Sequence, residues 1–298
     1  MNQFTSQLRY KLALITIFSA CMSCTACGVK IQGIDLGRMF NAAGKVGDLG
    51  EKTAEEEAML GKNTIRALLV DSSINSQVNI QRYVNKVGYW LASHTSRTDL
   101  VWQFMVLDDT AVNAFAAPGG YIAITTGMLN SLNNEAELAG VLAHEIAHVV
   151  LYHHMNALQT KSKTGLLLDL ALLGTQVGNA STANEKGELK GPEVTGMFDK
   201  AVDDLYYRGL DRKDEYEADR LGVMLSAKAG YDPYAFVSVL QAIGSREGRE
   251  EKDLQRFIRV HPSATARLSS LEAVLLVTDS YELSNRILAQ RFINNIFP

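Results

Sequence analysis

The feature that most constrains this chain is an apolar stretch, LAGVLAHEIAHVVLYHH, which runs from Leu138 to His154 and holds four of the six histidines. His144 and His148 lie four residues apart, and Glu145 follows the first of them. Residues at this spacing lie on one face of an α-helix, so both imidazoles face the same point. Burying two histidines and a glutamate among aliphatic residues costs free energy unless they have a task. The sequence therefore predicts a buried helix over about 134–154 that carries a functional site.

The HEIAH pattern within this stretch is typical of a zinc site. Two imidazoles and one carboxylate suit a catalytic Zn²⁺ whose fourth position holds water, and zinc lowers the pKa of that water to about 7. Glu145 lies about 100° further round the helix, where it reaches the water without binding the metal. We predict one Zn²⁺ per chain, with His144 and His148 as ligands and Glu145 as the catalytic base. The alternative is a pair of core histidines satisfied by hydrogen bonds.

His153 and His154 end the same stretch. In one class of zinc peptidases a third histidine ligand stands six residues beyond the second, which is the position of His154. That class has a glycine at which the chain turns back, and Leu151 stands there instead. We therefore expect the helix to continue and to carry both histidines away from His148. They are interpreted as helix-end residues that suit the helix dipole, and not as ligands.

The third ligand is expected from RKDEYEADRLG, which begins at Arg212. On a helix, Glu215 and Asp219 share a face, whereas Glu217 points away. Glu215 is the candidate metal ligand, and Asp219 is placed to hydrogen-bond a ligand histidine and fix its tautomer. The alternative is a charged helix face in contact with solvent.

The remaining hydrophobic pattern predicts an α+β domain that is mostly helical, with one small sheet. Pro118, Gly119 and Gly120 separate two β-prone runs and indicate a hairpin. Strands are expected at 101–107, 112–118 and 121–127. Helices are expected at about 53–70, 75–94, 213–228, 233–245, 263–276 and 281–296.

The N-terminal residues 1–27 differ from the rest of the chain. A basic start, a short apolar run and small residues before Cys21 are typical of a signal peptide, here with a lipobox. All the cysteines of the chain, Cys21, Cys24 and Cys27, lie in this region, so a metal-binding C-x2-C-x2-C motif is an alternative. We predict that Cys21 is lipidated, with Cys24 or Cys27 as other candidates and plain cleavage as the alternative.

The rest of the chain is expected to form one domain. Residues 28–50 are rich in Gly and indicate a tether, and residues 51–298 are predicted to be the folded domain. Within it, a segment at about 160–205 is expected to be a mobile or flap-like insertion. Its apolar part at 165–174 suits a buried helix, with a mobile flap or a helix that contacts a membrane as the alternatives. The net charge of −4 is spread along the chain and gives no basic face for nucleic acid.

The motifs in combination resemble the CAAX prenyl protease/HtpX clan of zinc metallopeptidases, in its soluble periplasmic branch of BepA- and LoiP-like proteases. The resemblance rests on HEIAH, the later EYEADRLG, and on VNAFAAPGGYIAITTGML, AGYDP and HPSATARLSSLE. It implies a gluzincin-type domain whose small sheet borders the active-site cleft. It also implies that the strand around Asn113, Ala114 and Phe115 binds an extended substrate by adding a strand to the sheet. His261 matches a family histidine near the metal, which aids the transition state or closes the open zinc position as a latch.

The resemblance further implies the function. We expect a metalloendopeptidase that hydrolyses unfolded or misassembled cell-envelope proteins. The resemblance also implies that unfolded polypeptides are the substrates and that the outer-membrane assembly machinery is a partner. The expected location is the periplasm of a Gram-negative bacterium, with a lipid anchor in the membrane. The alternative is a latched or non-catalytic, chaperone-like binding protein in which His261 is a fourth zinc ligand.

Overall fold

The structure, a computed structural model, describes residues 53–69, 72–161, 200, 202–203, 205–247, 252–278 and 285–296, with two short strands near the N-terminus. The chain divides into two units, Met1–Ala42 and Ala43–Pro298. In the first unit, strand β1 (Lys30–Ile31) pairs antiparallel with β2 (Ile34–Asp35). The predicted signal peptide, the lipidation of Cys21 and most of the predicted flap lie outside the described residues.

The second unit contains a three-stranded sheet. Its strands are β3 (Gln103–Leu107), β5 (Tyr121–Thr125) and β4 (Ala114–Ala117), in the order β3-β5-β4. β3 runs parallel to β5, and β4 runs antiparallel to it through the turn η2 (Pro118–Gly120), as the predicted hairpin requires. Gly119 has a φ of 76°, and a Cβ at this position would lie 2.5 Å from the Ala58 Cα, so the turn needs glycine. β4 is thereby an edge strand of the described sheet.

Helices surround the sheet, and the predicted class, a mostly helical α+β domain with one small sheet, is confirmed. The helices are α3 (Ala54–Leu68), α4 (Val78–Ala92), α5 (Thr126–Ser131), α6 (Glu135–Val150), α7 (His153–Lys161), α10 (Arg212–Lys228), α11 (Tyr234–Gly244), α12 (Lys252–Val260), α13 (Ala264–Thr278) and α14 (Asn285–Ile296). α5, α7 and α12 were not among the predicted helices. Within the described residues, no helix combines the length and the apolar composition needed to cross a bilayer.

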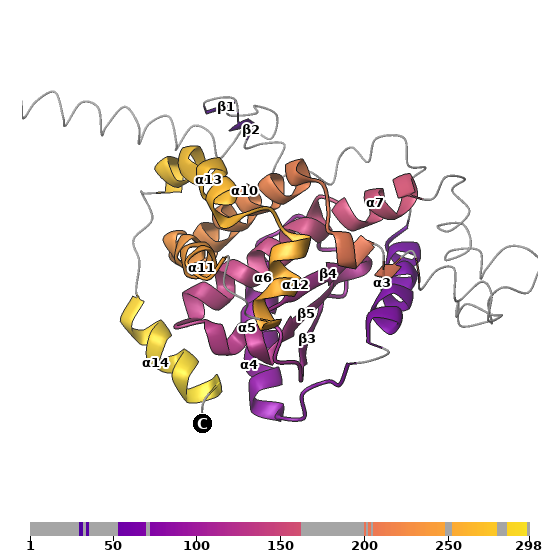
Figure 1. Cartoon of the computed structure of the whole chain (residues 1–298), viewed down its shortest axis with the longest axis horizontal. Coiled ribbons are helices and arrows are strands. Elements are labelled where there is room, and N and C mark those ends of the chain that lie inside the picture. The colour runs from indigo at the N-terminus through magenta and orange to yellow at the C-terminus, as the bar shows by residue number, and fades with distance from the viewer. Residues whose placement is uncertain are drawn as a thin grey trace, which may run out of the picture. The chain divides into compact units, whose positions relative to one another are not determined.

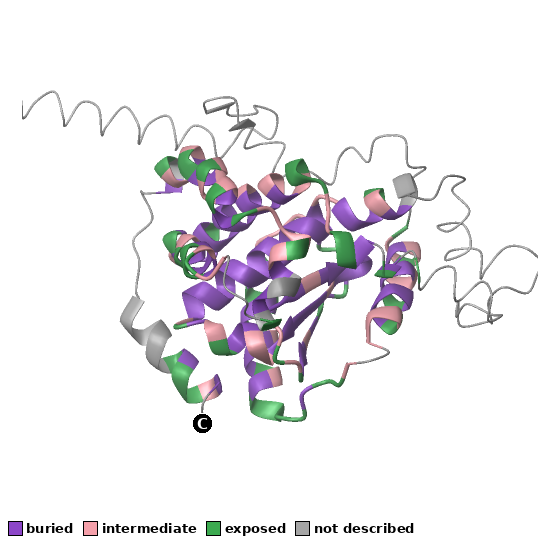
Figure 2. Cartoon of the chain, in the orientation of Figure 1, coloured by how far each residue is buried: buried purple, intermediate pink, exposed green. Residues whose placement is uncertain are grey.

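Helix α6 lies between the sheet and the helices α10 and α11, and all its residues are buried (Figures 1 and 2). It packs against β4 and β5, and also against α4 and α14. Its contact with α10 is unusually close at Gly222, where a Cβ would lie 2.9 Å from the backbone nitrogen of His144. The absence of a side chain at this position lets α10 bring its carboxylates next to the histidines of α6.

The end of α6 differs from the prediction. The helix stops at Val150, and α7 begins in a new direction at His153. Between them Tyr152 has a φ of 58°, a left-handed backbone that costs a residue with a side chain about 1–2 kcal/mol. A contact from elsewhere in the chain helps to offset this cost, because the guanidinium of Arg97 lies 4.6 Å from the centre of the Tyr152 ring. The prediction of one uninterrupted helix was therefore wrong.

Candidate metal centre

The side chains of His144, His148 and Glu215 meet where α6 contacts α10. The Nε2 atoms of the two histidines lie 3.1 Å apart. Nε2 of His148 is 3.5 Å from one carboxylate oxygen of Glu215, and Nε2 of His144 is 3.8 Å from the other. The ligand atoms of a tetrahedral Zn²⁺ with bonds of about 2.0 Å lie about 3.3 Å apart. The three donors therefore fit one zinc ion with small movements.

The protonation of these groups also suits a metal. Burial, and then the charge of Arg267, lowers the pKa of His144. Burial and the neighbouring His144 lower the pKa of His148 well below its usual value. Burial alone would raise the pKa of Glu215, but His261 and His144 bring it below its ordinary value. Two neutral imidazoles and an ionised carboxylate are the forms that bind zinc.

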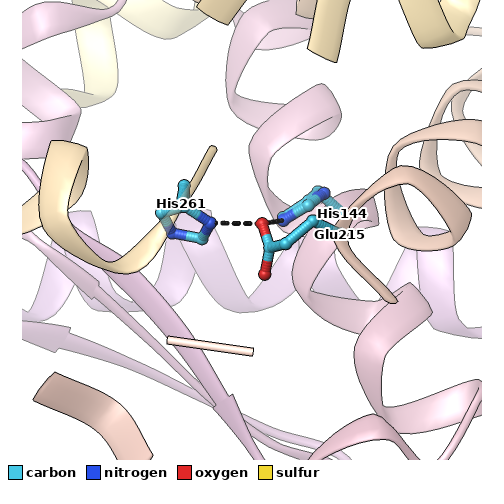
Figure 3. A group of neighbouring side chains, drawn as sticks. All are labelled: His144, Glu215 and His261. Carbon is cyan, nitrogen blue, oxygen red and sulfur yellow. Dashed lines mark hydrogen bonds and ion pairs between the residues drawn. The ribbon is translucent and has the colours of Figure 1, made fainter. Parts of the chain in front are cut away.

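His261 lies directly beside this centre (Figure 3). Its Nδ1 is 2.6 Å from a carboxylate oxygen of Glu215. Figure 3 shows His261 and His144 approaching that carboxylate from different sides, and donor atoms of all three residues lie within 4.8 Å of one another. Nε2 of His261 is buried and makes no hydrogen bond to any described residue. The structure thus places His261 at the site, while its role stays a prediction.

Glu145 faces a cavity of about 30 Å³ next to the same centre. Such a space holds about one water molecule. Asn113, Ala114 and Phe115 of the edge-strand region line the cavity as well, so the structure brings the predicted base and the predicted substrate strand together. Burial and the neighbouring Glu215 raise the pKa of Glu145 to about 8. A cation at the centre would favour the ionised form and lower this pKa.

Two buried charges support His144 from behind. Its Nδ1 lies 2.9 Å from a carboxylate oxygen of Asp219, as the predicted pairing requires. Arg267 of α13 donates two hydrogen bonds to the same carboxylate, with lengths of 3.0 and 2.6 Å. Burial alone would raise the pKa of Asp219, but Arg267 and His144 hold it well below its usual range. Asp219 is therefore ionised and can accept the Nδ1 proton of His144.

Arg267 was not predicted as part of the site, although the sequence contains a signal for it. Ala264, Arg267, Leu271 and Val274 recur at spacings of three and four, and all four are buried. This is the pattern of the inward face of a helix. A charged residue on such a face needs a buried partner of opposite charge.

A different group supports His148. Its Nδ1 lies 3.0 Å from Nδ1 of His153, and both rings are buried. Nε2 of His153 is 3.7 Å from a carboxylate oxygen of Glu217 and 4.0 Å from one of Asp214. When Nε2 of His148 binds a metal, its proton is on Nδ1, so His148 donates to His153. The prediction that His153 points away from His148 was wrong, because the chain reverses at Tyr152.

His154 also turns back toward the site. Its ring stacks on Tyr206, with centroids 4.8 Å apart and an angle of 7° between the planes. The Tyr206 hydroxyl donates a hydrogen bond of 2.6 Å to the carbonyl oxygen of Ala116 in β4. Both rings line the cavity beside Glu145. No local sequence pattern predicts Tyr206 at the site, since its position depends on contacts between distant segments.

Two histidines and a glutamate in an HExxH pattern on one helix, with a glutamate from a second helix packed against it, are the arrangement typical of the HExxH metallopeptidases. Within that class the chain belongs to peptidase family M48, which its residues 76–275 match. This confirms the resemblance drawn from the motifs, including its BepA-like branch.

Known relatives agree with this assignment. The chain is 25% identical over 236 residues to the beta-barrel assembly-enhancing protease of Escherichia coli K12, which covers 78% of this chain and 45% of that protein. It is 28% identical over 240 residues to the mitochondrial metalloendopeptidase OMA1 of Arabidopsis thaliana, covering 79% and 45%. It is 31% identical over 194 residues to OMA1 of Schizosaccharomyces pombe, a match that covers 64% of this chain and 51% of that protein. The chain spans about half the length of the curated relatives it matches.

Proposed function

We propose that this chain is a zinc-dependent endopeptidase that cleaves unfolded or misassembled proteins of the bacterial cell envelope. The observation that carries the proposal is the convergence of His144, His148 and Glu215, whose donor atoms lie 3.1 to 3.8 Å apart. Membership of peptidase family M48 supports the reaction class.

The chemistry follows from the positions of the side chains. When bound, zinc supplies a positive charge that polarises the scissile carbonyl and makes a water molecule acidic near neutral pH. His144, His148 and Glu215 hold the ion. Glu145 takes a proton from the attacking water and delivers it to the leaving nitrogen. His261 is placed to stabilise the negative charge that develops on the substrate.

Three further residues position the ligands. Asp219 accepts the Nδ1 proton of His144, and Arg267 fixes the Asp219 carboxylate. His153 accepts the Nδ1 proton of His148. Such outer partners orient the ligand rings and fix their tautomers, and they raise metal affinity without touching the metal.

The substrate binds as an added strand along the edge of β4 in this proposal. Asn113, Ala114 and Phe115 line the cavity that also contains Glu145, which supports a bound peptide at this edge. Main-chain pairing requires an extended segment, and folded proteins rarely offer one. The edge-strand site therefore selects unfolded chains.

The cellular setting is proposed from the sequence and the relatives. The signal-peptide pattern and Cys21 support a lipid-anchored protein in the periplasm of a Gram-negative bacterium. The Escherichia coli relative is a beta-barrel assembly-enhancing protease, which supports the outer-membrane assembly machinery as a partner.

The decisive experiment compares the purified wild type with Glu145→Gln. Zinc content is measured by mass spectrometry and cleavage by the degradation of unfolded casein. We expect both proteins to bind about one zinc per chain, and only the wild type to cleave. Equal cleavage by the two proteins would contradict the proposal that the chain is an enzyme.

A second candidate function is a latched, chaperone-like binding protein. The distance of 2.6 Å between His261 and Glu215 favours it, because His261 is close enough to act as a fourth ligand. Removing a latch frees the open zinc position, so His261→Ala would then gain activity and lose zinc faster to a chelator. Loss of activity in His261→Ala instead supports a role in the transition state.

A further inference from the structure

A second and much larger cavity adjoins the candidate metal centre. Its volume is about 430 Å³, and it shares Leu210, Val260 and His261 with the small cavity beside Glu145. This volume lies in the range of pockets that bind small ligands or side chains. The two cavities are therefore neighbours on either side of His261, and the larger one is within reach of the residues that flank the cleaved bond of a peptide held at the metal centre.

The lining of this larger cavity is strongly positive. Arg208, Arg212 and Arg259 line it, and all three are exposed. They come from three separate segments: Arg208 precedes α10, Arg212 begins it, and Arg259 lies in the last turn of α12. The whole chain has a net charge of −4, so three arginines around one cavity are a local reversal of its charge.

Among the described residues of the lining, Glu247 is the one acidic side chain, so one carboxylate stands against three guanidinium groups. Glu247 accepts a hydrogen bond of 2.9 Å from the backbone nitrogen of Ala264, at the start of α13. One of the guanidinium groups is also held in place, since that of Arg259 lies 4.3 Å from the centre of the Tyr207 ring. A stacked guanidinium keeps its donors free for a ligand in the plane of the group.

We propose that this arginine-lined cavity is a substrate subsite that binds a carboxylate of the peptide, supplied by an Asp or Glu side chain or by the C-terminus. This inference rests on the proposed peptidase function. The physical basis is the fit between guanidinium and carboxylate, which can form two parallel hydrogen bonds. A positive cavity beside the cleaved bond also attracts acidic segments from solution and disfavours basic ones.

The test uses internally quenched peptides of one length and the zinc-loaded full chain. A Glu, Gln or Lys is moved through each position on both sides of the cleaved bond, and each peptide is made with a free and an amidated C-terminus. We expect kcat/KM for Glu to exceed that for Lys by about tenfold at one position, and the ratio to shrink with added salt. A preference for free over amidated C-termini would instead identify the terminus as the source of the carboxylate.

Variants then connect the preference to the cavity. Arg212→Glu places an acid in the first turn of α10, where the helix dipole favours it, so the fold is maintained. Arg259→Gln removes the charge of a second arginine. We expect each single variant to reduce the ratio of kcat/KM for the Glu peptide to that for the Lys peptide several-fold. The double variant is expected to abolish or invert this preference. Kinetics that show no preference in the wild type, or a preference unchanged in the pair, would overturn the proposal.

The chain offers a matched control. Arg82 and Lys86 are two exposed cations that line another cavity, of about 450 Å³, which shares none of its lining residues with the metal centre. Arg82→Glu with Lys86→Gln changes the net charge by the same amount as the test pair. We expect this control to keep the preference of the wild type, and an equal loss in both pairs would show that only the overall charge matters.

Peptide binding to Glu145→Gln separates this inference from the proposed function. Fluorescence anisotropy of the same Glu and Lys peptides reports selectivity without cleavage. Selective binding by Glu145→Gln, together with no cleavage by the wild type, would support the subsite and reject the enzyme. Cleavage without selectivity would support the enzyme and reject the subsite.

Discussion

His144 and His148 lie one turn apart on the same helix, yet they are supported in contrasting ways. Behind His144, Asp219 and Arg267 form an ion pair in which the exposed side-chain fractions are 0% and 1%. Behind His148, the support is the ring of His153. The carboxylates that face the far side of that ring are 29% and 36% exposed.

Because the charges behind His144 are buried and those behind His153 are partly exposed, substitutions in the two groups are expected to affect different properties of the protein. Removing one member of a buried ion pair leaves an uncompensated charge in the core and costs about 3–5 kcal/mol. A partly exposed pair is screened by water and contributes about 0–1 kcal/mol. We therefore expect substitutions behind His144 to lower the free energy of unfolding. Substitutions behind His148 are expected to lower the affinity for the metal instead.

The largest effect is expected from Arg267→Leu. The substitution leaves the buried Asp219 carboxylate without its cationic partner, so the free energy of unfolding falls by about 3–5 kcal/mol. Urea denaturation of the metal-free protein, followed by circular dichroism, measures this change. The control is Arg267→Leu combined with Asp219→Asn, which removes both charges and is expected to be more stable than Arg267→Leu alone. A loss below about 1 kcal/mol in the single variant would contradict the comparison.

A smaller change on the same side is Asp219→Asn. The amide keeps the shape of the side chain but accepts the Nδ1 proton of His144 more weakly, so zinc affinity is expected to fall about 10–100-fold. Competition with a chromogenic chelator measures the dissociation constant. Substitution by Co²⁺ adds a visible spectrum that reports the geometry of the ligands. An unchanged dissociation constant would mean that Asp219 serves the fold and not the metal.

The sequence was enough to predict the residues whose positions depend on one helix. The spacing of His144 and His148, and of Glu215 and Asp219, fixes which side chains share a face, and the structure brings these two faces together. Their assignment as metal ligands and partner stays a prediction. The sheet and most helices followed from periodicity in the same way.

The residues that were missed depend on contacts between distant segments. Nothing in VVLYHH shows that the helix will end, because the left-handed backbone of Tyr152 is stabilised by Arg97. Arg97 is itself held by Glu57 of α3, at 2.5 Å. The return of His153 to His148 is therefore a property of the folded core, and no local pattern encodes it.

His153 gives the next prediction in order of size. His153→Leu removes the acceptor for the Nδ1 proton of His148 but fills the space with apolar volume. We expect zinc affinity to fall about tenfold, with a smaller loss of unfolding free energy than in Arg267→Leu. His153→Asn restores an acceptor oxygen near the position of Nδ1 and is expected to recover most of the affinity. Equal zinc binding by His153→Leu and the wild type would show that the contact is only packing.

The smallest effect is expected from Glu217→Gln. The carboxylate lies 3.7 Å from Nε2 of His153, and Asp214 remains 4.0 Å from the same nitrogen to receive its proton. We expect zinc affinity to fall by about threefold or less, and the difference to shrink as salt is raised. Lys213→Gln is the control, because Lys213 pairs with the same carboxylate at 3.7 Å from the exposed surface of α10. A tenfold loss of zinc affinity in Glu217→Gln that persists at high salt would mean that the contact between Glu217 and His153 is as strong as that between Asp219 and Arg267. That result would contradict the difference proposed between the two histidines.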